Sequence, residues 1–296
     1  MPGPASPEHV CAVVVTYNRK ELLRECLKAL LAQSRLPDEI LTVDNASTDG
    51  TREMLRREFP RVRVLNLSEN VGGAGGFHAG MKWAYERDYD WLWLMDDDSI
   101  PTAPALEKLL LSRNVLEDLD CKPVLLASKV VWEDGALHPM NLPTPYHEKR
   151  LLFTQALEHG YMLIRTVSFV SVLLERGAVE KYGLPYKDYF IWGDDLEYSG
   201  RVLREENGYF VPSSMVLHKT KQKYSPRIST GPRFYYNVRN KVWIMKTASF
   251  SAKEKLLYSW RLAWSIWSYL KANRRAEGLK IVLRGLMDGV TGKARE

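Results

Sequence analysis

The chain has 296 residues, of which 45% are hydrophobic and 26% are charged, the composition of an ordinary globular protein. No apolar run approaches the roughly 18 residues that a membrane-spanning helix requires, and residues 1–7 lack the basic start and apolar core of a secretory signal. Three scattered cysteines (Cys11, Cys26 and Cys121) have no metal-ligand spacing. They favour buried thiols in a reducing compartment, so we expect a cytoplasmic location.

The positive charge is concentrated near the C-terminus. The whole chain carries +6, whereas residues 246–296 hold eleven Lys or Arg against four Asp or Glu, so the rest of the chain is close to neutral. A basic segment beside a neutral body favours an anionic partner, either a membrane surface or a polyphosphate. No nucleic-acid-binding motif accompanies this charge, so we expect no nucleic-acid partner.

Strands and helices alternate through the first hundred residues. Residues 9–15 form a continuous apolar run, typical of a strand buried on both faces, and residues 19–33 repeat apolar side chains with the period of a helix. The same criteria predict strands at 40–44, 62–67 and 91–95, helices at 51–58 and 77–86, and a loop at 68–76. This order is typical of a parallel sheet with crossover helices.

Beyond residue 100 the alternation fades. The pattern predicts a helix at 106–116 and strands at 124–132 and 167–174. The stretch 133–158 contains three prolines and is expected to be a mobile or substrate-covering loop. From residue 231 onward the pattern is helical.

Three consecutive aspartates, Asp96, Asp97 and Asp98, follow the strand predicted at 91–95. Packed carboxylates repel one another unless a cation neutralises them, and hard divalent cations prefer oxygen ligands. The carboxyl ends of strands in open α/β sheets are also where ligands bind. The position therefore predicts a metal site and a phosphorylated substrate, and a solvated acidic turn is the alternative.

Asp44 ends the second predicted strand, where a carboxylate can accept hydrogen bonds from a ribose or a base. The alternative is an Asx turn that starts the next helix. Asn45 or Ser47 could fill that structural role equally well, which would leave Asp44 free for a ligand.

A glycine-rich run follows the third predicted strand, between Asn70 and Phe77. Glycine lets the backbone approach a ligand closely, and the run opens a helix whose amide end attracts anions. It matches neither the P-loop nor the dinucleotide fingerprint, which disfavours both of those protein classes. Its glycines are Gly72, Gly73, Gly75 and Gly76.

A second acidic cluster comprises Trp192, Gly193, Asp194 and Asp195. One of its carboxylates could act as a general base toward an attacking hydroxyl, whereas the structural alternative is a helix N-cap for residues 196–204. His218 follows in a strand-like context, where a lone histidine is more often structural than a metal ligand.

Together these motifs resemble the inverting GT-A glycosyltransferases of family 2, over roughly residues 10–218. The resemblance is carried by Val-Val-Val-Thr-Tyr-Asn-Arg at 13–19, by Val-Asp-Asn-Ala-Ser-Thr-Asp-Gly at 43–50 and by the aspartates at 96–98. The glycine run, the element at 192–195 and His218 are similar to the galactofuranosyltransferase branch, and rhamnosyltransferases share much of this pattern.

The resemblance implies a GT-A fold, a Rossmann-like, mainly parallel sheet flanked by helices, with a C-terminal helical extension. Residues 1–230 would form the catalytic domain, with a nucleotide-sugar half at about 9–100 and an acceptor half at about 101–230. Residues 231–296 would form the helical region.

The resemblance also implies roles for the candidate residues. Asp96, Asp98 and His218 would hold a divalent cation, Mn²⁺ or Mg²⁺, that bridges the donor diphosphate. Asp195 would be the catalytic base, with Asp194 and Trp192 binding the acceptor. The donor site would comprise Thr16, Asn18, Asp44, Asn70, Gly72, Gly73, Gly75, Gly76 and Asp97.

The function thus implied is transfer of galactofuranose from UDP-galactofuranose to a hydroxyl of a glycan or polyprenyl-linked glycan acceptor. A rhamnosyltransferase using dTDP-rhamnose is the alternative of the same class. A non-catalytic, sugar-nucleotide-binding assembly subunit is the alternative of another class, and intact aspartates in both clusters argue against it.

Residues 251–272 are expected to form an amphipathic helix. Leu256, Trp260, Trp264 and Trp267 fall within about 80° of arc, and Lys271, Arg274 and Arg275 cluster at the end. Trp with Lys and Arg suits a bilayer interface with anionic lipid, which would place the protein at the inner face of the cell membrane. The alternative is packing on the catalytic domain or on another subunit of a homo-oligomer.

Overall fold

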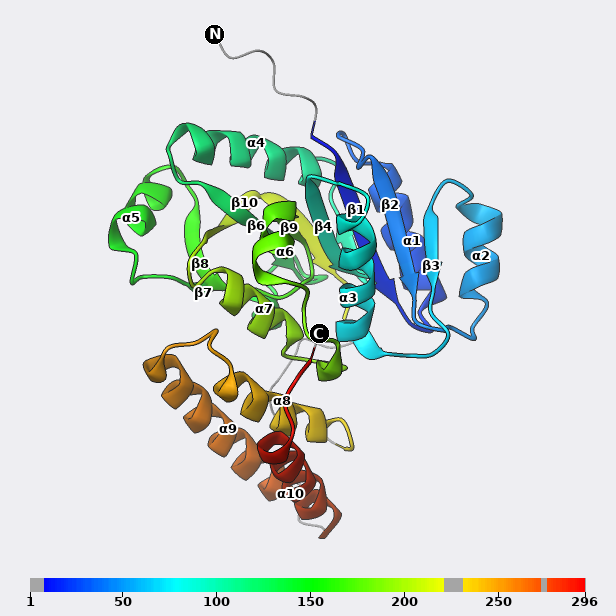
Figure 1. Cartoon of the computed structure of the whole chain (residues 1–296). Helices are drawn as coiled ribbons and strands as arrows, with labels where there is room; N and C mark the ends of the chain where they lie inside the picture. Colours follow the sequence, from blue (N-terminus) through cyan, green and yellow to red (C-terminus); the bar gives the residue numbers. More distant parts are fainter. Residues whose placement is uncertain (1–7, 221–230, 273–275, 296) are drawn as a thin grey trace.

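One mixed sheet runs through the computed structural model, which describes residues 8–220, 231–272 and 276–295 (Figure 1). Its strands lie in the order β3-β2-β1-β4-β9-β6-β10-β8-β7, and β5 pairs with β10. The strands are β1 (Val10–Thr16), β2 (Glu39–Asp44), β3 (Arg63–Asn66), β4 (Trp91–Asp96), β5 (Ser99–Pro101), β6 (Pro123–Val131), β7 (Thr144–Pro145), β8 (Met162–Thr166), β9 (Val172–Glu175) and β10 (Asn207–His218).

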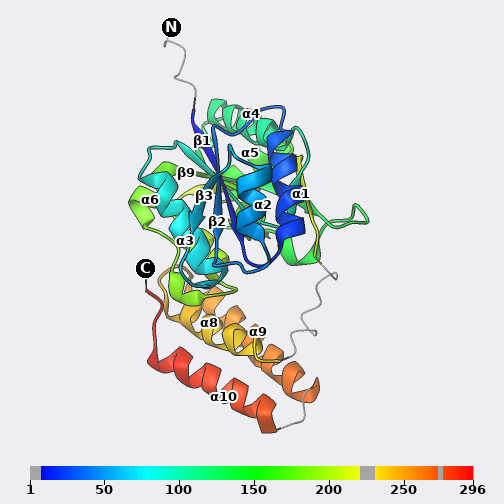
Figure 2. The same cartoon turned by 90° about the vertical axis from the view of Figure 1, so that its right-hand side faces the viewer.

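Helices cover both faces of this sheet, and three more lie together at one end of the molecule (Figures 1 and 2). The α-helices are α1 (Lys20–Leu31), α2 (Thr51–Glu58), α3 (Gly72–Tyr85), α4 (Ala105–Asp118), α5 (Arg150–Glu158), α6 (Arg176–Tyr182), α7 (Asp194–Val202), α8 (Phe234–Lys246), α9 (Ala252–Ala272) and α10 (Ala276–Thr291). Two short 3₁₀ helices are η1 (Pro139–Asn141) and η2 (Lys187–Tyr189).

The first four long strands confirm the predicted parallel sheet. β1 pairs in parallel with both β2 and β4, and β2 pairs in parallel with β3. β9 then runs antiparallel to both of its neighbours, β4 and β6, so the complete sheet is mixed. The predicted helices at 19–33, 51–58 and 106–116 correspond to α1, α2 and α4.

The central strand β1 is buried on both faces, which explains its uninterrupted apolar sequence. Val10, Ala12 and Val14 belong to the core under α1, α2 and α4. The alternate residues, such as Val13, belong to the core under α3, α6 and α7. Cys26, on α1, is buried in the first of these cores, as the expected buried thiols require.

Two sequence predictions in the second half were wrong. The expected loop at 133–158 contains η1, β7 and α5, because Phe153 and Ala156 of α5 pack against the core while the prolines are confined to residues 139–145. The expected strand at 167–174 is shorter, since only residues from Val172 onward pair as β9. Phe169 and Val170 are buried outside any strand, so their apolar character reflects burial alone.

The predicted helical region is confirmed as α8, α9 and α10. α8 shares a buried cluster with the rest of the chain, in which Trp243 and Ile244 pack with Tyr189 and Ala74. The expected domain boundary near residue 230 lies outside the described residues, and the division into two domains stays a prediction. Within the described ranges, none of the helices combines the length and the apolar character needed to cross a bilayer.

Candidate active site

Two strands bring the aspartate run and His218 together. Asp96 ends β4, while His218 ends β10, which is not a neighbour of β4 in the sheet. The short strand β5 closes this gap, because its Ser99 pairs with His218 and the Lys219 N–H donates to the Asp98 carbonyl at 2.9 Å. Ligand atoms of Asp96, Asp98 and His218 all lie within 4.8 Å of one another.

A second layer orients the imidazole of His218. Its Nδ1 lies 2.8 Å from Oδ1 of Asn141, and the amide nitrogen of Asn141 donates to Ser168 at 2.8 Å. This assigns the proton to Nδ1 and leaves Nε2, 3.1 Å from Oδ1 of Asp98, available to a cation. Asn141 was missed from the sequence because it lies in η1, within the stretch expected to be a loop.

The electrostatics of the aspartate run suit a bound cation. Burial raises the pKa of Asp96 well above its ordinary value, and the neighbouring carboxylates of Asp98 and Asp97 add to that effect. Burial also raises the pKa of Asp97 to about 6. Burial alone would raise the pKa of Asp98 as well, but the hydrogen bonds and charges of His218 and Arg19 lower it.

Arg19 is a functional candidate to which sequence reasoning assigned no role. Its guanidinium Nη1 lies 3.3 Å from Oδ1 of Asp97 and 2.5 Å from Oδ2 of Asp98, and its side chain is half-exposed. The sequence offered one sign of this role: Arg19 lies three residues after the end of β1, a strand that ends beside the aspartates. The arginine partly neutralises the carboxylates and reaches the cluster from the solvent side.

The residues expected at the nucleoside end of the donor lie along the ends of β1 and β2. The Thr16 hydroxyl donates to Oδ2 of Asp97 at 2.7 Å, so it is tied to the aspartate run. Asn18 has a positive φ of 52° and accepts from the Thr48 N–H at 2.7 Å, holding the turn after β2. Through these contacts, Thr16 and Asn18 hold neighbouring parts of the candidate site in place.

The Asx turn that opens α2 is made by Asp49, whose Oδ1 accepts from the Thr51 N–H at 3.1 Å, so neither Asp44 nor Asn45 or Ser47 fills that role. Asp44 nevertheless has protein partners. Its Oδ1 accepts from the Ser47 N–H at 3.0 Å and its Oδ2 from Nε of Arg52 at 2.6 Å. Asn45 is used elsewhere, because its side chain donates to the Gly72 carbonyl at 3.1 Å. Asp44 is fully buried, and any ligand would have to share these partners.

The glycine run is the first part of α3, so the loop prediction was wrong from Gly72 onward. Gly72 has a φ of +76°, and a Cβ there would lie 1.9 Å from the Phe190 carbonyl oxygen. A Cβ at Gly76 would lie 2.4 Å from Cγ1 of Val15 on β1. Both glycines are therefore required for close packing of the helix.

The other members of the run differ in their surroundings. A Cβ at Gly75 would lie 2.5 Å from the Val71 side chain, whereas one at Gly73 would meet nothing within 4 Å. Asn70 accepts from the Gly72 N–H at 2.9 Å and so fixes the start of α3. The helix N-terminus lies after β3, where its amide groups suit an anion.

The second acidic cluster begins α7. The N-cap is Gly193, so neither aspartate fills the capping role that the sequence left open. Burial, with the charge of Asp195, raises the pKa of Asp194 to about 8. Burial also raises the pKa of Asp195, although backbone N–H groups such as that of Leu196 oppose the shift. The charge of Asp194 adds to the larger effect of burial on the pKa of Asp96, which links the two clusters electrostatically.

A strained turn immediately precedes Asp194 and Asp195 in the chain. Phe190 has φ 63° and ψ −61°, and the Ile191 N–H donates to the Tyr189 carbonyl at 2.7 Å, which together define a γ-turn. Trp192 also has a positive φ, of 65°, and its side chain is 40% exposed. Such conformations persist only where the surroundings impose them.

Asn240 of α8 imposes this conformation and was missed from the sequence. Its amide nitrogen lies 3.0 Å from the carbonyl oxygen of Tyr189, 2.8 Å from that of Ile191 and 2.7 Å from that of Trp192. Its side chain is only 2% exposed. A helix from the C-terminal region therefore holds the turn that precedes Asp194 and Asp195.

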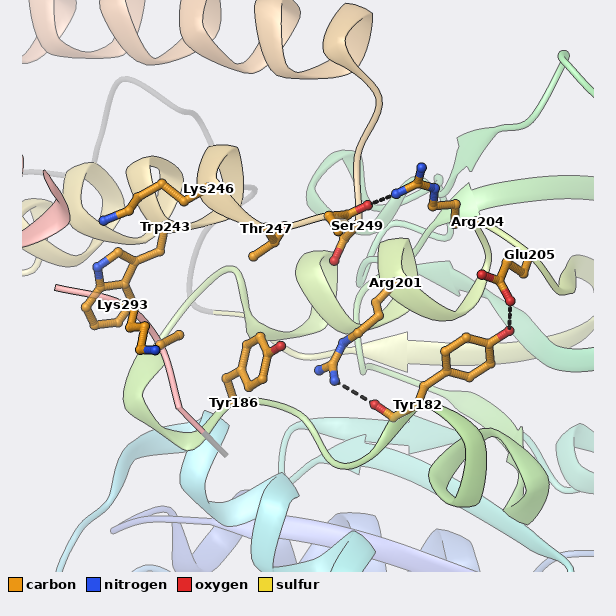
Figure 3. A pocket seen from close by; sticks show the side chains of 12 residues that line it. Tyr182, Tyr186, Arg201, Arg204, Glu205, Trp243, Lys246, Thr247, Ser249 and Lys293 are labelled. Atoms are coloured by element: carbon orange, nitrogen blue, oxygen red, sulfur yellow. Dashed lines mark hydrogen bonds between the residues drawn. The ribbon is translucent and has the colours of Figure 1, made fainter.

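Two cavities lie outside the acidic clusters. A cavity of about 350 Å³ separates α6 and α7 from α8 and the C-terminal segment, and Figure 3 shows its basic lining. Arg201 in this lining donates to the Tyr182 carbonyl at 2.7 Å and Arg204 donates to the Ala248 carbonyl, so we assign the cavity no role in the reaction. A larger cleft of about 770 Å³ follows α3 and reaches Phe190 and Arg239.

Comparison with known proteins places the chain among glycosyltransferases. The family model described as Glycosyl transferase family 2 matches residues 11–163. Galactofuranosyltransferase GlfT1 of Mycolicibacterium smegmatis is 31% identical over 207 residues, covering 67% of this chain and 66% of that protein. GlfT1 of Mycobacterium tuberculosis (strain H37Rv) is 31% identical over 206 residues, covering 67% and 65%. The chain thus spans slightly under two thirds of the length of these relatives.

Solved structures share the fold. S. aureus TarS superposes with a TM-score of 0.65 at 14% identity, covering 96% of this chain and 49% of that one. The TarS 1–349 fragment in complex with UDP gives a TM-score of 0.64 at 14% identity, covering 95% and 80%. Identities this low speak for the arrangement of the backbone alone.

Proposed function

The chain belongs to glycosyl transferase family 2 and has the GT-A fold, and on that premise we propose that it transfers a sugar from a nucleotide donor to an acceptor hydroxyl with inversion. One observation carries this proposal: ligand atoms of Asp96, Asp98 and His218 lie within 4.8 Å of one another. The charge of Asp194 also contributes to the raised pKa of Asp96, so the two acidic clusters interact. One cluster can serve the leaving group and the other the attacking group.

The first cluster fits a divalent cation. Asp96 and Asp98 offer carboxylate oxygens, and His218 offers an imidazole nitrogen whose opposite side is hydrogen-bonded to Asn141. This set fits Mn²⁺ or Mg²⁺, and the imidazole favours Mn²⁺. When bound, the cation would stabilise the negative charge that develops on the departing diphosphate.

Asp195 is the proposed base. Its raised pKa suits a group that takes a proton near neutral pH, and Asp194 beside it would bind acceptor hydroxyls. As the acceptor O–H bond breaks, the proton moves to Asp195 and the oxygen bonds to the anomeric carbon. The bond from that carbon to the diphosphate breaks on the opposite face. A single displacement of this kind inverts the anomeric centre.

UDP-galactofuranose is the proposed donor, and a glycan or polyprenyl-linked glycan is the proposed acceptor. Support for the donor comes from relatives named galactofuranosyltransferase at 31% identity. We further propose that the enzyme acts in the cytoplasm, a compartment consistent with three buried free thiols.

Release of the nucleoside diphosphate, UDP or dTDP according to the donor, tests the proposal. The enzyme is incubated with UDP-galactofuranose or dTDP-rhamnose, each with Mn²⁺ and with EDTA, and slow donor hydrolysis is measured without acceptor. We expect Mn²⁺-dependent release from UDP-galactofuranose. Release from dTDP-rhamnose alone would overturn the donor, and release that is insensitive to EDTA would overturn the metal site.

Asp195→Asn separates an enzyme from a pure binding subunit. The variant should bind donor nearly as well as the wild type but lose turnover, because it cannot accept the acceptor proton. Asp118→Asn, an exposed position at the end of α4, is the matched control. Equal behaviour of the two variants would contradict the assigned base.

A further inference from the structure

The two last helices expose large apolar side chains along one side of each. Trp260 on α9 is 65% exposed and Met287 on α10 is 66% exposed. We call these two sets the apolar stripes. The stripe of α9 comprises Leu256, Leu257, Trp260, Trp264 and Trp267, and that of α10 comprises Leu279, Leu283, Met287 and Val290. Contiguous exposed apolar surface of this kind indicates an interaction site.

Both stripes face away from the helices that pack behind them. On α9 the buried residues Leu262 and Tyr269 lie roughly 180° around the helix from the middle of the stripe. On α10 the buried Gly285 and Gly289 lie roughly 140° from the stripe and contact α8. The three helices lie together at the end of the molecule away from the sheet (Figure 2).

Basic side chains accompany the apolar stripes. Lys253 and Lys271 fall at the same helical angle as the middle of the α9 stripe, one near each end, and Nζ of Lys271 lies 5.1 Å from the Trp267 ring centroid. Lys280 and Arg284 border the stripe of α10 and are exposed, and Nε of Arg284 lies 3.7 Å from Oδ2 of Asp288, which partly neutralises it. Arg274 and Arg275, expected in the same cluster, lie outside the described residues.

Two of the acidic side chains on these helices are engaged by the protein. Glu254 accepts from Nε of Arg165 at 2.8 Å, and Asp288 accepts from the Tyr235 hydroxyl at 2.6 Å. The surface around the stripes is therefore apolar in its middle and predominantly basic at its borders. Tryptophan beside lysine is the combination that suits a bilayer interface, where the ring lies among the headgroups and the ammonium reaches lipid phosphates.

We propose that α9 and α10 lie on an anionic lipid bilayer, with both apolar stripes in the interface and the basic borders on the headgroups. A second copy of the chain fits less well. A two-fold contact through this face would set the same patch against itself and bring lysine and arginine borders toward like charges. Lipid phosphates instead complement these charges. The inference concerns binding and goes beyond the proposed transfer reaction.

Vesicle flotation with the full chain tests the inference. Vesicles of phosphatidylcholine with phosphatidylglycerol should bind the protein at least about tenfold more tightly than vesicles of phosphatidylcholine alone, and added salt should weaken the binding. Trp260→Gln combined with Trp267→Gln should reduce binding to anionic vesicles at least about tenfold, and Lys271→Glu should reduce it further. Leu151→Gln, at an 88% exposed position on α5, should leave binding unchanged.

Light scattering in the absence of lipid measures the oligomeric state and so tests the alternative that a second copy of the chain covers this face. The inference is overturned if the wild type does not bind anionic vesicles, if the control variant binds as weakly as the tryptophan variant, or if the tryptophan substitutions only dissociate an oligomer. UDP release without vesicles should be unchanged in every variant, which also shows that each is folded. Failure of vesicle binding is thereby distinguishable from failure of the proposed function.

Discussion

Replacing Asn240 with alanine tests whether α8 positions the turn that precedes the proposed base, Asp195. The amide of Asn240 contacts the carbonyl oxygens of Tyr189, Ile191 and Trp192 at 2.7 to 3.0 Å, and the variant leaves these oxygens without that donor. Phe190, between them, holds a strained γ-turn. Without the amide, the turn can relax toward ordinary backbone conformations and carry Asp194 and Asp195 away.

The magnitude follows from the two N–H bonds that the amide supplies. Each buried hydrogen bond whose acceptor is left unsatisfied costs about 1 to 3 kcal/mol, so the loss is roughly 2 to 6 kcal/mol. The strain at Phe190 favours relaxation by about 1 to 3 kcal/mol. Since about 1.4 kcal/mol corresponds to a tenfold change in population, we expect kcat to fall at least about tenfold.

The assay measures kcat and the donor KM for transfer, together with the melting temperature. Asn240→Ala should lower kcat while the donor KM changes less than about threefold, because most of the proposed donor residues lie on or beside β1, β2 and the start of α3. Asn237→Ala is the matched control, since Asn237 lies on the same helix and donates at 3.2 Å to Ser265. An unchanged kcat in a variant with a lowered melting temperature would refute the reasoning, because the amide would then serve stability alone.

Three further predictions concern other parts of the site. Asn141→Ala should weaken Mn²⁺ binding about 10- to 100-fold in calorimetry by releasing the imidazole of His218, and unchanged affinity would contradict that role. Burial and Asp195 raise the pKa of Asp194 to about 8, so stability present at low pH is lost as the pH rises through that value. The melting-temperature advantage of Asp194→Asn should therefore grow between about pH 4 and 8, and a constant difference would oppose this. Gly76→Ala should cost about 1 to 3 kcal/mol in denaturant unfolding and Gly73→Ala almost nothing, so equal costs would count against the packing argument.

The parallel half of the fold could be predicted because its signals are local. The apolar run of β1 and the helical period of α1 each lie within one element. The helix α5 was missed because three prolines nearby dominated the pattern of its region. Its burial depends on a core assembled from distant segments.

The candidate site was predictable to the extent that its chemistry is carried by residue type. Asp96, Asp98 and His218 were identified as one set only through the family resemblance, since the histidine is 120 residues from Asp98. Asn141 and Asn240 could not be found, because an asparagine has no role until the fold supplies its partners. Those partners lie 77 residues away for Asn141 and about 50 for Asn240.

The three-residue pairing of β5 with β10 has a consequence for the order in which the protein matures. β10 enters the sheet between β6 and β8, and only then does His218 arrive beside Ser99 and Asp98. A nascent chain that has emerged only as far as β9 already contains its aspartates but lacks the imidazole. The proposed cation site would therefore be complete only once β10 has joined the sheet, and the proposed activity would begin no earlier than the arrival of that strand.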